Sequence, residues 1–258
     1  YIKMSMITDF KNFLNEVTFT SFLKYFILII VYAVILTGNL YTGFIIKNRL
    51  RKNGVGKCFE NPVNNEYRGL PDVLHFKNEK LNDAAATISN IALIVIVLFL
   101  FICFLPNNVR NLKLIFLFTT LAVVGYIIRV VAFAVTVPPP PVQQHEDEYD
   151  NILEKIMKEG DPRAAVSDFM FSGHAFFIVL SLLFIWNYRK ISDTFYLSPK
   201  LFYIVYGILA VLAIITIPAI SLSRLHYSSD VVIGTSIAVL LFLSRNHFAL
   251  KLNYQELL

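Results

Sequence analysis

Six apolar runs divide the 258-residue chain, and each is long enough, or nearly so, to cross a lipid bilayer as a helix. A spanning helix needs about 20 predominantly apolar residues, because only a structure that pairs its own backbone groups is stable inside hydrocarbon. The runs cover Phe26 to Ile46, Ala84 to Leu105, Leu112 to Val137, Ser172 to Tyr188, Leu201 to Leu222 and Ser228 to Ser244. The sequence therefore predicts an all-α membrane protein with six transmembrane helices.

The composition argues against an ordinary soluble enzyme. Hydrophobic residues make up 56% of the chain and charged residues 16%, whereas soluble domains are about 45–50% apolar and about 25% charged. The formal net charge of +5 does not indicate a nucleic-acid-binding protein, because the basic residues lie mostly at the ends of apolar runs and form no basic stripe. We therefore expect membrane lipid, and no nucleic acid, as the partner.

We predict a single polytopic membrane domain over residues 1–258, with a six-helix core at 26–248 and a C-terminal tail at 249–258. In the lead-in, residues 1–25, apolar side chains recur at helical spacing. This pattern fits a helix in the membrane interface and an extension of the first span equally well. The sequence leaves open whether the chain forms a homo-oligomer.

Six spans place both termini on one side of the membrane and the starts of the fourth and sixth spans on the other. Lys and Arg are divided almost evenly between the two sides, so the positive-inside rule does not decide the orientation. The loop after the third span is acidic, which gives a weak preference for an outward-facing second side.

Polar and ionisable residues gather at the starts of the fourth and sixth spans. The first group is Asp168, Ser172 and His174, and the second is Arg224, His226, Tyr227 and Asp230. Ionisable side chains at membrane depth are costly, so they mark functional sites by default. Their convergence predicts an active site at the N-terminal ends of helices 4 and 6.

The types and spacing of these residues are typical of phosphoryl transfer. His226 and Asp230 are four residues apart and share one face of a helix. A carboxylate beside one imidazole nitrogen leaves the other nitrogen available as a nucleophile. His174 could then act as general acid and base on an alcohol at phosphorus, and Arg224 offers a planar fork of donors to phosphate oxygens.

Each histidine taken alone would fit an interfacial residue that caps a helix, and only the combination favours catalysis. No metal or cofactor is required for this chemistry. A zinc site would need three or four close ligands, and neither an HExxH nor a CxxC spacing occurs in the chain.

Arg129 lies about eight residues, or roughly 12 Å, before the end of the third predicted span. An arginine at that depth needs a partner. Two interpretations are equally good: a structural pair with Asp168, Asp230 or a buried carbonyl group, and an anchor for a lipid phosphate.

The motifs together resemble those of the sphingomyelin synthase family, a six-span branch of the type 2 phosphatidic acid phosphatase superfamily. The family pattern Tyr-x2-Arg-x6-Thr fits Tyr126, Arg129 and Thr136; Asp-x3-Ser-Gly-His fits Asp168, Ser172, Gly173 and His174; His-Tyr-x2-Asp-Val fits His226, Tyr227, Asp230 and Val231. Departures at Val166, Ser167, Ala175 and Ser228 bear on the choice of headgroup and not on the type of reaction.

The resemblance implies a ceramide phosphotransferase that moves phosphocholine from phosphatidylcholine to ceramide, giving sphingomyelin and diacylglycerol. His226, oriented by Asp230, would attack phosphorus to form a phosphohistidine, and His174 would serve as acid and base. The remaining motif residues would bind substrate: Tyr126, Arg129, Asp168, Ser172, Arg224 and Tyr227. Such an enzyme would reside in the Golgi or the plasma membrane, with its site facing the lumen or the exterior.

Three alternatives stay open. The donor could carry an ethanolamine or an inositol headgroup in place of choline, because all these phospholipids present the same phosphodiester. A lipid phosphate phosphatase is disfavoured, since no Lys-x6-Arg-Pro element precedes the Ser-Gly-His motif and Phe171 stands where phosphatases usually have Pro. A non-catalytic lipid binder or transporter would not need His174, His226 and Asp230 together.

Overall fold

The computed structural model describes residues 79–104, 109–135, 171–190, 198–223 and 226–252, together with residues 27, 30, 34, 254 and 257. Its helices are α3 (Glu79–Cys103), α4 (Val109–Val135), α6 (Gly173–Tyr188), α7 (Pro199–Leu222), α8 (Ser228–Leu243) and α9 (Arg245–Lys251). Within these ranges no residue lies in a β-strand. The predicted all-α membrane architecture is confirmed.

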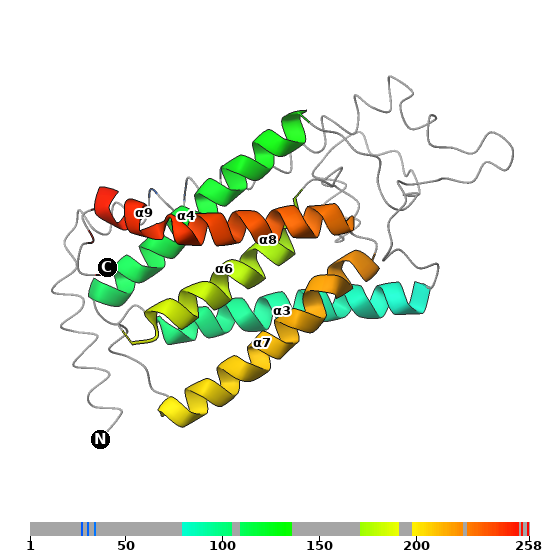
Figure 1. The fold of residues 1–258 in the computed structure, drawn as a ribbon, viewed down its shortest axis with the longest axis horizontal. Helices are drawn as coiled ribbons and strands as arrows, with labels where there is room; N and C mark the ends of the chain where they lie inside the picture. Colours follow the sequence, from blue (N-terminus) through cyan, green and yellow to red (C-terminus); the bar gives the residue numbers. More distant parts are fainter. Residues whose placement is uncertain are drawn as a thin grey trace, which may run out of the picture.

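Helix α6 lies at the centre of the bundle, with α8 on one side and α3 and α7 on the other (Figure 1). It contacts α3, α4, α7 and α8. A helix that is apolar all round is stable only when neighbours cover it, and Phe176, Phe184 and Tyr188 of α6 are fully buried. Phe184 also makes edge-on ring contacts with Phe104 at 5.6 Å and Phe118 at 5.4 Å. The core of the protein therefore surrounds α6.

Of the described helices, α3, α4 and α7 are long and apolar enough to span a bilayer, and α8 with α9 would make one further span that bends by 49°. Helix α6 has only 16 residues. These helices match the second to sixth predicted spans within a few residues. The predicted first span, Phe26 to Ile46, and the lead-in lie outside the described residues, except for helical positions 27, 30 and 34.

The outer face of α7 shows how the bundle meets lipid. Its exposed apolar side chains recur every three or four residues, so they form one stripe along the helix. The stripe contains Leu201, Ile204, Ile208, Val211 and Ile215. A continuous apolar surface of this kind is unfavourable in water and stable in hydrocarbon, which agrees with a membrane-spanning helix.

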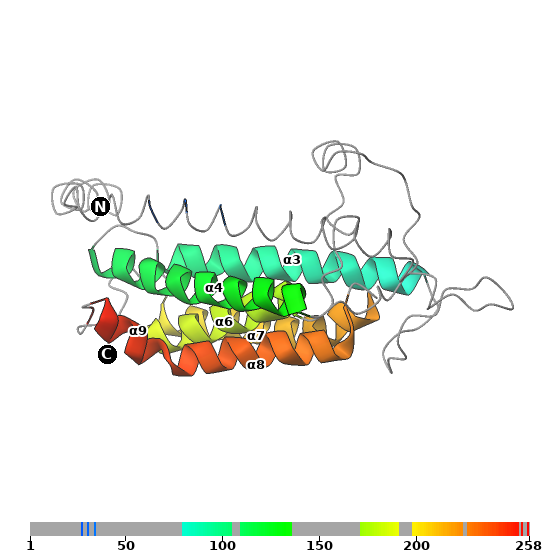
Figure 2. The same cartoon turned by 90° about the horizontal axis from the view of Figure 1, so that it is seen from above.

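One end of the bundle brings together the starts of α3, α6 and α8 and the ends of α4 and α7 (Figures 1 and 2). The starts of the fourth and sixth predicted spans, α6 and α8, were expected on one side of the membrane, and they do lie together. We call this the site end of the bundle.

Gly234 of α8 sets the approach of α8 to the start of α6. A methyl carbon added there would lie 2.5 Å from the backbone oxygen of Ser172. We expect Gly234→Ala to lower the stability of the protein by about 1–3 kcal/mol, because backbone atoms must separate to make room. Thermal unfolding in detergent would measure the loss.

Gly207 provides the matched control. It lies inside α7, and an added methyl carbon there meets nothing within 4 Å. Gly207→Ala should therefore leave stability unchanged or raise it by up to about 1 kcal/mol, the helix-propensity difference. Equal melting temperatures for the two variants would contradict the close packing at Gly234.

Candidate active site

The start of α6 is fixed by Ser172. Its side-chain oxygen accepts a hydrogen bond from the backbone N–H of Ala175 at 3.3 Å, and its carbonyl oxygen accepts one from Phe176 at 3.1 Å. Serine is among the preferred residues at this position because it satisfies an otherwise unpaired backbone donor. Ser172 is fully buried, so this cap places His174 firmly in the first turn of the helix.

The start of α8 is fixed by Asp230. Its Oδ2 accepts a hydrogen bond from the backbone N–H of Tyr227 at 2.9 Å, and its Oδ1 accepts one from the hydroxyl of Ser229 at 3.3 Å. The carboxylate lies in the first turn, where the helix dipole favours negative charge. Asp230 is fully buried, so these donors replace water around it.

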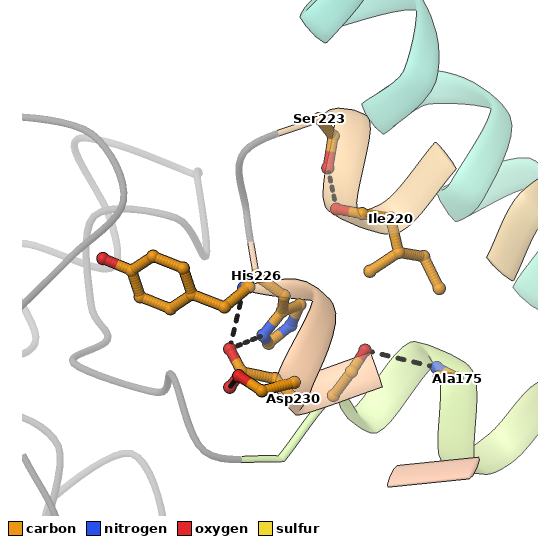
Figure 3. A network of polar contacts seen from close by, with 8 residues as sticks. Ala175, Ile220, Ser223, His226 and Asp230 are labelled. Carbon is orange, nitrogen blue, oxygen red and sulfur yellow. Dashed lines mark hydrogen bonds and ion pairs between the residues drawn. The ribbon is translucent and has the colours of Figure 1, made fainter. Parts of the chain in front are cut away.

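His226 lies beside this carboxylate, in the link between α7 and α8. Its Nδ1 is 3.7 Å from Oδ2 of Asp230, a distance within ion-pair range and longer than a good hydrogen bond. Figure 3 shows the two side chains directed toward one another. Burial lowers the pKa of His226, Asp230 opposes this effect, and Arg129 adds to it. The imidazole is therefore neutral near pH 7.

A backbone hydrogen bond joins the two helix starts. The N–H of Ser172 donates to the carbonyl oxygen of Asp230 at 3.0 Å. Because Ser172 is two residues from His174 and Asp230 carries the contact to His226, this bond brings the two histidine motifs to one place.

Helix α4 contributes Arg129 and Tyr126. A methyl carbon added to Gly173 would lie 2.5 Å from Nη1 of Arg129 and 3.6 Å from the hydroxyl of Tyr126. The guanidinium carbon also lies 5.3 Å from the centre of the Tyr126 ring. Arg129 therefore lies over the first residue of α6, next to His174 in sequence, and its fixed positive charge makes this place suitable for an anion.

Helix α3 adds a residue that the sequence motifs do not include. The side-chain oxygen Oδ1 of Asn90 lies 2.9 Å from Nε2 of His174. An amide oxygen accepts from an imidazole N–H and so selects the tautomer in which Nε2 carries the proton. The sequence did contain a signal for this residue, because Asn90 is a polar residue inside the apolar run Ala84 to Leu105.

Most of the predicted site residues are thus gathered at the site end. The structure brings together Tyr126, Arg129, Ser172, His174, His226, Tyr227 and Asp230. Tyr227 is buried and contributes its backbone N–H to the carboxylate of Asp230. Asp168 and Arg224 lie outside the described residues.

The fold and the site together define a polytopic membrane protein with paired histidines at the starts of two helices. Residues 166–247, less than half of the chain, match the family model described as PAP2 superfamily C-terminal. The matched segment contains His174, His226 and Asp230, and it supports the type 2 phosphatidic acid phosphatase superfamily and an enzyme acting on phosphate groups. No curated protein matches the chain.

The protonation of His226 can be tested directly. Since burial lowers its pKa, His226 should titrate below the ordinary histidine value of about 6.5. In Asp230→Asn the pKa should fall further, because the carboxylate favours the charged imidazolium. NMR of the protein with labelled histidine, assigned with His226→Gln, measures both values. A midpoint at or above 6.5 in the unchanged protein would contradict the buried, neutral imidazole.

Proposed function

We propose that the protein transfers a phosphoryl headgroup between membrane lipids, with phosphatidylcholine as donor and ceramide as acceptor. The observation that carries the proposal is the convergence of His174 with the His226–Asp230 pair at the linked starts of α6 and α8. The match of residues 166–247 supports chemistry at a phosphate group. The choice of ceramide rests on the motif resemblance.

In the first step of the proposed reaction, Nε2 of His226 attacks the phosphorus of the donor. Asp230 lies on the Nδ1 side of the ring, so it favours the tautomer with the proton on Nδ1 and the lone pair on Nε2. A P–N bond forms and the P–O bond to diacylglycerol breaks. His174 begins this step as the imidazolium, gives its Nδ1 proton to the departing oxygen, and keeps on Nε2 the proton that is hydrogen-bonded to Asn90.

In the second step, His174 removes the proton from the ceramide hydroxyl. The oxygen attacks the phosphohistidine, the P–N bond breaks, and His226 is restored. Arg129 carries a fixed charge over Gly173, the residue before His174, so it is suited to bind the phosphate oxygens in both steps. Tyr126, Ser172 and Tyr227 complete the proposed substrate-binding set, together with Asp168 and Arg224.

The proposal includes a site that faces the lumen or the exterior, in the Golgi or the plasma membrane, as the motif resemblance implies. At the site end, the basic residues of the described ranges are Lys80 and Arg129, whereas the opposite end has Arg110, Lys113, Arg189, Lys190, Lys200, Arg245 and Lys251. Cytoplasmic ends of membrane helices are enriched in Lys and Arg. Over the full sequence the two predicted sides carry similar numbers of Lys and Arg, so the uneven distribution within the described ranges does not decide the orientation.

The proposal is tested by resolving lipid products. The full chain is reconstituted with labelled ceramide and with phosphatidylcholine, phosphatidylethanolamine or phosphatidylinositol in separate vesicles. We expect labelled sphingomyelin from phosphatidylcholine, and no product from His226→Ala, which lacks the nucleophile. Product from another donor would keep the reaction type and change the headgroup.

The same preparations separate the remaining alternatives. Phosphate released from phosphatidic acid or ceramide phosphate, without a ceramide product from any donor, would assign a lipid phosphate phosphatase in place of the transferase. If neither assay gives a product, and lipid transfer is equal in the unchanged protein and in His226→Ala, the protein would be assigned as a non-catalytic binder or transporter.

Asn90 acts in this proposal as a positioning residue for His174. Asn90→Leu removes the acceptor at Nε2, so we expect turnover to fall by at least about tenfold with little change in KM, because the acid and base loses its orientation. Asn90→Asp keeps an acceptor oxygen. It should recover turnover and shift the pH profile upward, since the carboxylate favours the imidazolium. Equal pH profiles in the two variants would leave Asn90 with a packing role.

A further inference from the structure

The end of the bundle opposite the site end carries a cluster of side chains that the proposed reaction does not use. It lies where α6 ends and α7 begins (Figure 1). The cluster consists of Trp186, Arg189, Lys190, Lys200, Tyr203 and Tyr206. We call it the basic aromatic surface.

Trp186 lies at the centre of this surface. Its ring is 5.0 Å from that of Tyr206 and 6.2 Å from that of Tyr203. The guanidinium carbon of Arg189 lies 3.8 Å from the centre of the Trp186 ring, and Nη1 of Arg189 donates to the carbonyl oxygen of Trp186. A cation over an indole face is an attractive contact, so Arg189 is held in place beside the rings.

The surface faces outward. The exposed fractions of Trp186 and Tyr203 are 42% and 51%, and Lys190 and Lys200 are also exposed. The hydroxyl of Tyr206 donates to the carbonyl oxygen of Leu182 at 3.3 Å, which fixes that ring to α6. Aromatic rings beside basic side chains at helix ends are typical of the level of lipid headgroups.

Within the described ranges, the charges around the surface have one sign. In the described ranges, the start of α4 and helix α9 add Arg110 and Lys251 at this end, whereas Asp83 and Asp230 lie at the site end. The positive field is therefore not compensated locally by described carboxylates. Such a field attracts an anionic membrane surface and is lost beyond a Debye length.

We propose that the basic aromatic surface binds the headgroups of anionic phospholipids in the leaflet at that end of the bundle. Lys190 and Lys200 contact the negative headgroups, while Trp186 and Tyr203 lie at the boundary between headgroups and acyl chains. The fixed guanidinium of Arg189 offers a further donor to phosphate oxygens. This surface would enrich anionic lipid beside the protein.

Trp186 makes the proposal directly measurable, because it is the single tryptophan of the chain. The full chain is reconstituted in phosphatidylcholine vesicles that contain about one-fifth phosphatidylserine. In one sample the phosphatidylserine has brominated acyl chains, and in the other an equal amount of phosphatidylcholine is brominated. Bromine quenches only nearby indole, so the ratio of quenching reports which lipid surrounds Trp186.

We expect brominated phosphatidylserine to quench Trp186 several-fold more strongly, since each basic residue near a membrane surface contributes a factor of about five in attraction. The double variant Lys190→Gln with Lys200→Gln should lose the difference, as should the unchanged protein in high salt. Lys80→Gln, an exposed lysine at the site end, is the matched control and should keep it.

Equal quenching by the two brominated lipids in the unchanged protein would overturn the proposal. A preference that survives in the double variant would overturn it as well, because the attraction would then come from elsewhere. An unchanged melting temperature shows that the double variant is folded. None of these measurements depends on catalysis, so the result stands apart from the test of lipid headgroup transfer.

Discussion

The hydrogen bond from the backbone of Ser172 to that of Asp230 is the contact on which the candidate site depends. It joins the beginnings of two helices that are far apart in sequence. Both partners are fully buried, so the bond does not compete with water and strongly favours one relative position of the helices. Side chains at the two helix starts can then be placed to within the short distances that proton transfer requires.

The same few residues hold the helix starts in place and contribute groups to the candidate site. The carboxylate of Asp230 caps α8 through the N–H of Tyr227 and also lies beside His226. Gly173 leaves room for the guanidinium of Arg129, and Gly234 leaves room for the backbone of Ser172. The starts of α6 and α8 are thus held by short side chains and backbone groups, which take fixed positions with little loss of side-chain entropy.

The sequence was sufficient to predict most of the fold, because spanning helices are defined by long apolar runs that need no tertiary information. The boundaries of α6 and α8 agree with the predicted spans, since Ser172 begins one run and Ser228 the other. The histidine motifs could also be placed on one side, because an even number of crossings separates them. The central position of α6 was not predicted, since the sequence of an apolar helix does not indicate whether protein or lipid covers it.

Within the site, residues close in sequence were easier to predict than residues brought together by packing. The pair His226 and Asp230 follows from helical spacing alone. The contact between Asn90 and His174 joins α3 to α6, and no local pattern encodes the rotation of one helix against another. Arg129 illustrates the intermediate case: its depth in the span signalled a role, but only the packing of α4 on Gly173 shows where its charge lies.

Helices α6 and α8 have 16 residues each, and α3 has 25. At 1.5 Å per residue, the short pair measures about 24 Å and α3 about 38 Å. Figure 1 shows α3 extending past the starts of α6 and α8. The starts of α6 and α8 therefore lie deeper along the bundle than the start of α3. In the proposed reaction, a headgroup at the histidines would lie beside the first turns of α3, below the level at which that helix starts.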